Sequence, residues 1–169
     1  MIVLDGNSLT VDAVAKIARD NALVSLGADA RQAVVECAAF LDRLVEEGRP
    51  IYGLTTGFGA LDSRAVARDA TRSSQHNLLR SHAAGVGAPM AADAVRAMMA
   101  IRANVLASGL TGVREATLDA LLAMLNAGVI PRVPEQGSVG ACGDLAPLAH
   151  MSLPLIGEGE ARSEERRGG

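Results

Sequence analysis

The chain has 169 residues, 19 of them acidic and 16 basic, which gives a net charge of −3. No block of like charge is long enough to form a nucleic-acid-binding arm, so we expect no nucleic-acid partner. No segment approaches the roughly 18 uninterrupted apolar residues of a membrane-spanning helix, and the stretch MIVLDGNSLT lacks the basic start and apolar run of a signal peptide. We therefore expect a cytoplasmic protein with no membrane partner.

The composition favours helices over sheets. Hydrophobic residues make up 49% of the chain but aromatic residues only 2%, and Trp is absent. A core built from Ala, Val, Leu, Ile and Met suits closely packed helices better than a β-sandwich. The length is sufficient for one domain with a sizeable core. We predict a mainly α fold with a few short strands.

The predicted elements follow one another with recognisable start and stop signals. A short apolar strand at 2–4 precedes turn residues, and Ser8 or Thr10 can cap a first helix that ends near residue 20. Apolar residues then recur at helical spacing in later segments. The further predicted helices are 28–47, 66–84, 91–107, 113–127 and 144–154, and a second short strand is predicted at 50–52.

A basic residue interrupts the apolar stripe of the helix predicted at 91–107. Arg102 falls on the side of this helix that carries Val95, Met98, Met99, Val105 and Leu106. A buried charge needs a partner, and a subunit interface would supply one. We therefore hypothesise that Arg102 lies at a contact between subunits.

The cysteines and histidines form no recognisable disulfide or metal pattern. Cys37 and Cys142 are too few for the disulfide framework of a small secreted domain, so we expect both to be reduced. His76 and His82 do not have the i, i+4 spacing that places two ligands on one helix face, so we expect no metal site. His82 stands next to a helix end, where the helix dipole favours a cation, and this structural interpretation stays open.

The glycine-rich segment YGLTTGFG, residues 52–59, is neither a helix nor a regular strand. It matches neither the phosphate-binding pattern GxxxxGK[ST] nor the dinucleotide-binding pattern GxGxxG, which argues against phosphate binding. It does place the hydroxyl of Tyr52 beside open backbone that a small ligand can approach. Packing of Tyr52 in the core is the alternative.

The second glycine-rich segment, GSVGACGDLAPLAH, allows three interpretations. Cys142 could be a nucleophile, but His150, the base nearest to it, lies two turns along the next helix. The glycines could be simple turn formers with Asp144 as a carboxylate at a helix start, which does not explain the density of small residues. In the third interpretation the backbone cyclises: the Gly143 nitrogen attacks the Ala141 carbonyl, an approach that requires small flanking residues.

The segments YGLTTGFG, SHAAGVG and GSVGACGDLAPLAH, in this order, resemble the histidine ammonia-lyase branch of the aromatic amino acid ammonia-lyase family, from about residue 5 to residue 160. The resemblance implies the N-terminal helical portion of an ammonia-lyase-like (fumarase/aspartase-like) enzyme. It further implies a carbon–nitrogen lyase that eliminates ammonia from L-histidine to give urocanate, the first step of histidine degradation. A tyrosine or phenylalanine ammonia-lyase, or an aminomutase of the same family, is the alternative.

The resemblance also implies a prosthetic group. In this family an Ala-Ser-Gly triplet cyclises into a methylidene-imidazolone, an electrophile made from the backbone itself, and Ala141, Cys142 and Gly143 occupy its positions. Asp144 would support formation of the group. No metal is implied.

Three further residues gain roles from the same resemblance. Tyr52 would remove a proton from the β-carbon of the substrate; because a phenol is ordinarily protonated at neutral pH, the site would have to favour its phenolate. Gly59 would line the substrate pocket. His82 would contact the substrate ring, and a hydrogen-bonding side chain there suits an imidazole first, a phenol second and a plain phenyl ring third.

The chain departs from the family in two respects. Cys142 stands where the family has serine, so we expect cyclisation with loss of hydrogen sulfide in place of the second water, with a stalled site that keeps a buried thiol as the alternative. The chain is also much shorter than family members, whose further helices supply more site residues and whose active sites draw on several subunits of a homotetramer. We therefore expect this fragment alone to be inactive. A non-catalytic interaction module is the alternative from another class.

The expected organisation follows from these considerations. Residues 1–160 form an incomplete N-terminal ammonia-lyase domain, and residues 161–169 form a charged tail that is disordered or truncated. The expected partners are a small-molecule amino acid substrate and, for the full-length protein, further copies of the same chain in a homotetramer.

Overall fold

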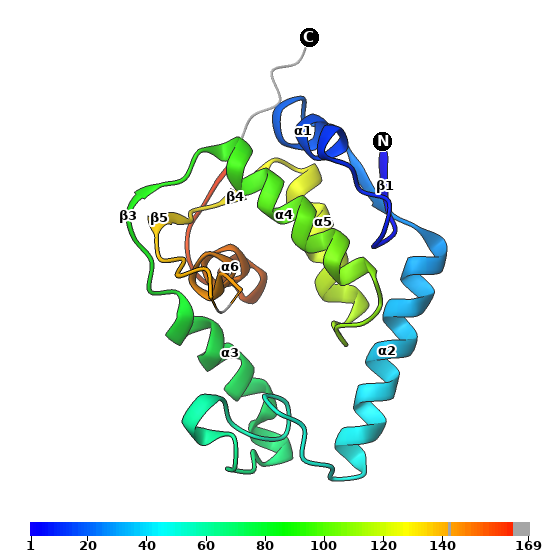
Figure 1. The fold of residues 1–169 in the computed structure, drawn as a ribbon, viewed down its shortest axis with the longest axis vertical. Helices are drawn as coiled ribbons and strands as arrows, with labels where there is room; N and C mark the ends of the chain where they lie inside the picture. Colours follow the sequence, from blue (N-terminus) through cyan, green and yellow to red (C-terminus); the bar gives the residue numbers. More distant parts are fainter. Residues whose placement is uncertain (142, 164–169) are drawn as a thin grey trace.

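The computed structural model of the protein describes residues 1–141 and 143–163, without the side chain of Arg68. Its α-helices are α1 (Val11–Arg19), α2 (Ala28–Glu46), α3 (Thr71–His82), α4 (Ala92–Ala107), α5 (Glu115–Asn126) and α6 (Leu145–Ser152). Its strands are β1 (Ile2–Leu4), β2 (Val24–Leu26), β3 (Val86–Pro89), β4 (Val129–Pro131), β5 (Pro134–Gln136) and β6 (Ala161–Ser163). Helices dominate and the strands are short (Figure 1), so the predicted mainly α fold is confirmed.

The core lies where α1, α4, α5 and the first turns of α2 meet (Figure 1). The side chains of Met99, Ala100 and Ala103 on α4 are fully buried, and α4 packs against both α1 and α5. Small alanines allow the helices to approach closely, while each buried Leu or Met side chain contributes roughly 1.5–3 kcal/mol to stability. The apolar, aromatic-poor composition therefore produces this close helical packing.

One charge lies inside the core. Arg96 of α4 is only 3% exposed. Its Nε and Nη2 donate to the carbonyl of Ile17 on α1 at 3.1 and 2.9 Å, and its Nη1 donates to the carbonyl of Leu125 on α5 at 3.1 Å. Both carbonyls lie in the last turn of a helix, where the backbone has no partner further along the helix and the dipole is negative. Arg96 thus joins the carboxyl ends of α1 and α5 to α4.

Sequence analysis singled out Arg102 on this helix and missed Arg96. The buried side of α4 runs through Val95, Met99 and Ala103, which places Arg96 on it and leaves Arg102 half-buried at its margin. Among residues 1–141 and 143–163, no ion pair involves Arg102. Its place at a subunit contact stays a hypothesis.

Two predictions near the first glycine-rich segment, one of a strand and one of a helix start, were wrong. The strand predicted at 50–52 is instead the start of a tight turn, because the carbonyl of Ile51 accepts the backbone N–H groups of Leu54, Thr55 and Thr56 at 3.0–3.3 Å. The helix predicted from residue 66 begins at Thr71, after a single 3-10 turn. The other helices begin and end within about two residues of their predicted positions, and Thr10 caps α1 by accepting the Ala13 N–H at 3.2 Å.

Within residues 1–141 and 143–163, the strands form three two-stranded sheets. β1 and β2 are parallel, β3 and β5 are antiparallel, and β4 and β6 are antiparallel. The β6 strand, residues 161–163, belongs to the segment that we predicted to be a tail, so these three residues are ordered by pairing with β4. The boundary at residue 160 stays a prediction. No helix in the described residues is both long and apolar enough to span a bilayer.

Replacing Arg96 with Met tests the role of the buried guanidinium. The variant leaves the carbonyls of Ile17 and Leu125 without these donors in a buried place, so we expect the free energy of unfolding to fall by roughly 2–5 kcal/mol. Urea denaturation followed by circular dichroism measures it. The control is Arg19→Met, because Arg19 is exposed and its nitrogen lies 3.7 Å from Asp93; a change of only about 0.5 kcal/mol is expected there. Equal losses in the two variants would contradict this role.

Candidate functional site

Tyr52 faces solvent at the tip of the first glycine-rich segment. Its side chain is 65% exposed, so the alternative of core packing is wrong. The edge of its ring meets the ring of Phe58, with centroids 5.9 Å apart at 81°, and its hydroxyl oxygen accepts the backbone N–H of Gly59 at 3.1 Å. Because the oxygen acts as acceptor in this bond, the phenolic proton remains available to another group. The segment therefore presents an oriented hydroxyl at an accessible place.

Glycines are needed where this segment folds on itself. Gly53 has a φ of +72°, and a Cβ there would stand 2.4 Å from the ring of Phe58. Gly59 has a φ of +55° and no heavy atom within 4 Å of where a Cβ would stand. Glycine adopts this left-handed conformation without strain. The backbone at Gly59 is therefore open, as expected for a pocket-lining position.

Helix α3 connects this segment to His82. The Nε2 of Gln75, in the first half of α3, donates to the carbonyl of Gly53 at 2.7 Å. His82 is the last residue of the same helix. At 1.5 Å per residue, the two positions are about 10 Å apart along the axis. The helix thus acts as a spacer with Tyr52 near one end and His82 at the other.

The hydrogen bonds around His82 determine which ring nitrogen carries its proton. Nδ1 lies 2.9 Å from the carbonyl of Leu78 and 3.1 Å from Oγ of Ser81, and that hydroxyl itself donates to the Leu78 carbonyl at 2.9 Å. A carbonyl only accepts, so this network favours the tautomer with the proton on Nδ1. Nε2 is then left as an acceptor for a donor group on a ligand.

The second glycine-rich segment forms a loop of left-handed residues before α6. Gly140, Gly143 and Asp144 have φ values of +72°, +78° and +58°. The N–H of Ala141 donates to the carbonyl of Val139 at 2.8 Å. Cys142 lies outside the described residues. Among residues 1–141 and 143–163, no heavy atom beyond the chain neighbours lies within 4 Å of where a Cβ would stand at Gly140 or Gly143.

Asp144 does not use its carboxylate in the way the sequence suggested. It occupies the residue before α6, but its side chain makes no capping hydrogen bond to the helix. Its Oδ1 instead accepts the hydroxyl of Ser138, whose Oγ also accepts the N–H of Gly140 at 3.3 Å. The carboxylate therefore fastens the two ends of the loop to each other. Ser138 was not predicted as a site residue, because a serine six positions before an aspartate is not a recognisable sequence motif.

Three residues hold this loop against the end of α3. A Cβ on Gly137 would stand 3.0 Å from Cα of Gly85, so the two backbones touch where the loop begins. The N–H of Gly85 donates to Nε2 of His150 on α6 at 3.0 Å. Gly85 follows His82 by three residues. The structure thus brings the loop and the His82 end of α3 together.

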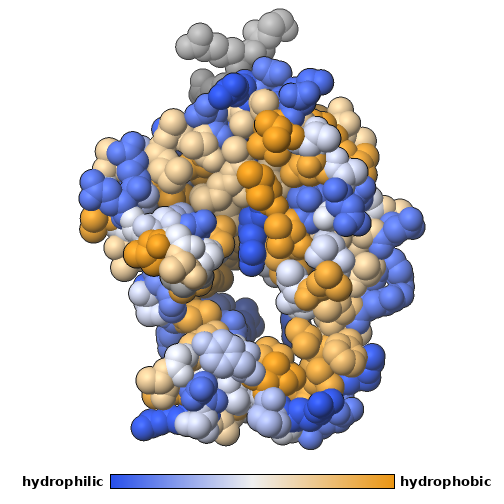
Figure 2. Space-filling view, viewed as in Figure 1, coloured by the Kyte–Doolittle hydropathy of each residue, from blue (hydrophilic) through white to orange (hydrophobic). Residues whose placement is uncertain are grey.

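The candidate residues therefore fall into two groups. Tyr52 and Gly59 contact each other, and the His82 end of α3 is joined to the loop that carries Ala141, Gly143 and Asp144. No hydrogen bond joins the first group to the second within the part of the chain that the structure describes. Figure 2 shows an open passage through the molecule between the helical core and the segment at the bottom of the view, bounded in Figure 1 by α2 and α3.

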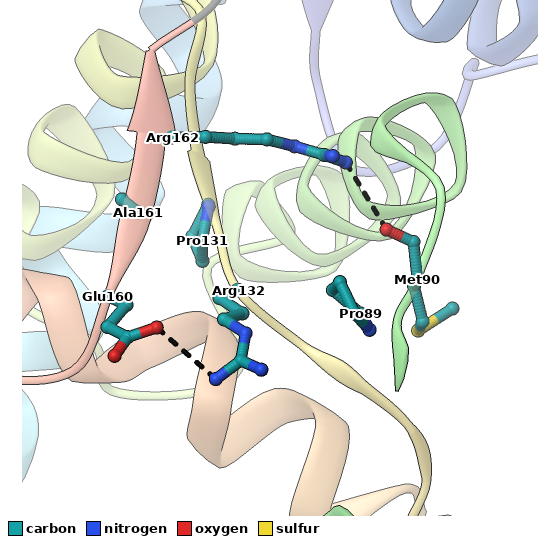
Figure 3. Close-up of a pocket in the computed structure, with 7 residues that line it drawn as sticks. All are labelled: Pro89, Met90, Pro131, Arg132, Glu160, Ala161 and Arg162. Atoms are coloured by element: carbon teal, nitrogen blue, oxygen red, sulfur yellow. Dashed lines mark hydrogen bonds and ion pairs between the residues drawn. The ribbon is translucent and has the colours of Figure 1, made fainter. Parts of the chain in front are cut away.

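A separate cavity of about 190 Å³ lies between β3, β4 and β6 (Figure 3). Its lining is Pro89, Met90, Pro131, Arg132, Glu160, Ala161 and Arg162. The two arginines are engaged, since Nη1 of Arg132 lies 3.2 Å from Glu160 and Nη2 of Arg162 donates to the carbonyl of Met90 at 3.2 Å. None of the predicted site residues lines this cavity.

Comparison with known proteins identifies the family of this chain. The model of the aromatic amino acid lyase family matches residues 9–168. The chain belongs to this family. It is 53% identical over 156 residues to a histidine ammonia-lyase of Symbiobacterium thermophilum, covering 92% of this chain and 31% of that protein. It is 48% identical over 160 residues to a histidine ammonia-lyase of Caldanaerobacter subterraneus subsp. tengcongensis, covering 95% of this chain and 32% of that protein.

A solved structure of a family member has the same fold in this region. The tyrosine aminomutase of Streptomyces globisporus superimposes with a TM-score of 0.91 at 40% identity, over 98% of this chain and 31% of that one. The chain thus spans about a third of the length of the family members it matches. The fold class predicted from the sequence resemblance is therefore that of the family.

Gly137→Ala tests the contact between the loop and α3. The added methyl group would stand 3.0 Å from Cα of Gly85 and 3.2 Å from Cβ of Ala146, so the backbone must shift. We expect the variant to lose roughly 1–3 kcal/mol in its free energy of unfolding, measured in urea. The control is Gly27→Ala, where the nearest atoms to the new methyl group are 3.4–4.0 Å away. A smaller loss for Gly137→Ala than for the control would show that the two segments are not in close contact.

Proposed function

We propose that this chain is the N-terminal part of a carbon–nitrogen lyase that eliminates ammonia from L-histidine to give urocanate. The observation that carries the choice of substrate is the hydrogen-bond network of His82, which leaves Nε2 as an acceptor. An imidazole N–H or a phenol O–H of the substrate can donate to it, whereas a phenyl ring cannot. The similarity to histidine ammonia-lyases favours the imidazole over the phenol.

The residues on both sides of Cys142 fit a backbone-derived methylidene-imidazolone. Gly143 has a left-handed φ of +78° and, beyond its chain neighbours, no heavy atom of the described residues within 4 Å of where its Cβ would stand, which supports an approach of its nitrogen to the Ala141 carbonyl carbon. In the proposed cyclisation a bond forms between these two atoms, and the carbonyl oxygen leaves as water with the N–H protons of Gly143 and Cys142, so that the Cys142 nitrogen becomes doubly bonded to the former carbonyl carbon. Cys142 then loses its Cα proton and its sulfur together as hydrogen sulfide, which leaves an exocyclic carbon–carbon double bond. When present, this group supplies an electrophile that assists departure of ammonia, and no metal is required.

Ser138 and Asp144 prepare this loop for cyclisation. Their hydrogen bond closes the segment across six positions and keeps the backbone in a turn of left-handed residues. Holding two reacting groups in one geometry removes much of the entropy cost of bringing them together. The proposed role of Asp144 is therefore to support formation of the group by positioning, through Ser138.

Tyr52 is the proposed base that takes a proton from the β-carbon of the substrate. Its ring is oriented by Phe58 and its oxygen by the Gly59 N–H, while the hydroxyl faces solvent. Gly59 has no side chain and leaves the approach to the oxygen open. We assign the proton transfer to this residue because its hydroxyl is oriented and accessible.

The activity belongs to a longer protein. The described residues contribute Tyr52 and His82 in two groups without a hydrogen bond between them, and the chain covers about a third of the relatives. We propose that the full-length protein is a cytoplasmic homotetramer and that the 169 residues, an N-terminal domain over 1–160 with a charged tail, are inactive alone. An aminomutase is the second candidate, favoured by the similarity to the tyrosine aminomutase. A non-catalytic interaction module, the alternative from another class, is favoured by the cysteine at position 142 and by the short length of the chain.

Tyr52→Phe in the full-length protein tests the proposed function. The wild-type protein is expected to convert L-histidine to urocanate, followed by absorbance, and the variant to lose about 10²–10⁴-fold in kcat because it lacks the base. The ring contact with Phe58 remains, so folding is expected to be unchanged by circular dichroism. The control is Phe40→Leu, a half-exposed position on α2. Urocanate formation at the wild-type rate by Tyr52→Phe would exclude this role. If the wild-type protein instead forms a β-amino acid, the activity is that of an aminomutase.

A further inference from the structure

We infer that His150 is a positioning residue whose neutral imidazole holds the His82 end of α3 against the loop that carries Ala141, Gly143 and Asp144. The inference rests on the proposed function for its effect on turnover, but the contact itself does not. Sequence reasoning considered His150 only as a distant base for Cys142. The structure gives it a different partner.

The geometry of the contact is specific. The backbone N–H of Gly85 donates to Nε2 of His150 at 3.0 Å, across 65 positions of the sequence. A Cβ at Gly85 would stand 3.2 Å from this same nitrogen and 3.3 Å from the carbonyl oxygen of Gln136, so only glycine fits between them without displacement. Since Nε2 accepts, Nδ1 must carry the proton of the neutral ring.

This bond lies at the centre of the second group of candidate residues. Gly85 follows His82 by three residues and touches Gly137, the first residue of the loop. His150 stands on α6, the helix that leaves the other end of the loop after Asp144. One imidazole therefore connects α3, the start of the loop and the helix that follows it. Loss of the bond frees the end of α3 relative to the loop.

The surroundings of His150 favour its neutral form. Burial lowers its pKa below the ordinary 6.5, and the positive charge of Arg132 lowers it further. On α3, which packs against α6, the Arg80 guanidinium is paired with Glu158 and His82 turns Nδ1 toward the Leu78 carbonyl. No carboxylate in the described residues forms an ion pair with His150.

The contact is expected to depend on pH in one direction. Protonated His150 has no acceptor at Nε2 and cannot bind the Gly85 N–H. Because the folded pKa lies below 6.5, the unfolded chain binds more protons between these two values. The stabilisation is therefore complete above pH 6.5, decreases as the pH falls below it, and is lost below the folded pKa.

The first test follows the Gly85 amide by NMR in the ¹⁵N-labelled 169-residue chain. In the wild type its chemical shift is expected to change with a midpoint below pH 6.5. His150→Gln keeps an acceptor that does not titrate, so the amide is expected to stay protected from hydrogen exchange without that pH dependence. In His150→Leu the acceptor is absent, and exchange is expected to be about tenfold faster or more than in the wild type above pH 6.5, with the difference disappearing below the folded pKa of His150. The control is His76→Gln, which leaves the Gly85 bond untouched.

The second test measures kcat and KM for urocanate formation in full-length proteins that carry the same substitutions. We expect His150→Leu to lower kcat about tenfold or more. We expect His150→Gln to keep most of the wild-type kcat. The decrease of kcat at low pH that has the same midpoint as the Gly85 amide shift should be absent in this variant. If His150 only stabilised the fold, the pH dependence of kcat would not share a midpoint with the chemical shift of the Gly85 amide.

The outcomes separate the inference from the proposed function. A Gly85 amide that neither titrates with His150 nor changes its exchange in His150→Leu overturns the inference. So does an unchanged kcat in His150→Leu in a full-length protein that makes urocanate. If the wild-type full-length protein makes no urocanate, the proposed function is wrong, while the Gly85 amide still decides whether His150 holds the end of α3.

Discussion

The buried guanidinium of Arg96 is the interaction on which the rest of the molecule depends. Burying a charge is costly unless its hydrogen bonds are satisfied, and here the donors meet carbonyls that helix geometry leaves without helical partners. The bond to Leu125 fixes the carboxyl end of α5. From that end the chain passes through β4 and β5 into the loop that begins at Gly137. A constraint in the core therefore determines where the candidate site loop starts.

Beyond the core, glycines determine how closely the loop approaches the end of α3 and which backbone conformation the loop adopts. The loop and α3 meet where Gly85 and Gly137 touch, and any side chain at Gly137 would meet backbone at 3.0 Å. Glycine is needed at positions 140 and 143 for a different reason. The φ values there are +72° and +78°, which would strain a residue that carries a side chain. The glycines that the sequence displays thus serve two different purposes, close approach and left-handed conformation, within one segment.

Much of the fold followed from patterns in the sequence. Helix spacing predicts α2, α4 and α5 because each buries one apolar side. The sequence offers Ser8 or Thr10 as the cap of α1, and the structure shows that Thr10 is the one that accepts a backbone N–H. Arg96 was missed because a periodic pattern indicates which side of a helix is buried and not which backbone carbonyls meet it. The strands β2 to β6 were not predicted because each has only three or four residues and pairs with a segment distant in the sequence.

The candidate site was predictable in its residues and not in its connections. The motifs that contain Tyr52, His82 and Asp144 were evident as sequence segments, but the link from Asp144 to Ser138 and the link from His150 to Gly85 depend on how distant elements meet. Tyr52 and Gly59 are held by contacts within one segment, whereas the second group is held by contacts between Gly85, Gly137 and His150, and α3 connects the two groups. The chain that carries both groups spans about a third of the length of the histidine ammonia-lyases it matches.

The central claim is that this loop converts its own backbone into an electrophile despite the cysteine at position 142. The most direct measurement is the intact mass of the purified protein together with the mass of the proteolytic peptide that contains residues 137–150. The account predicts a peptide lighter than its sequence mass by one water and one hydrogen sulfide, and Cys142→Ser should give a peptide lighter by two waters. A peptide at its full sequence mass, with a thiol at Cys142 that reacts with an alkylating reagent, would contradict it.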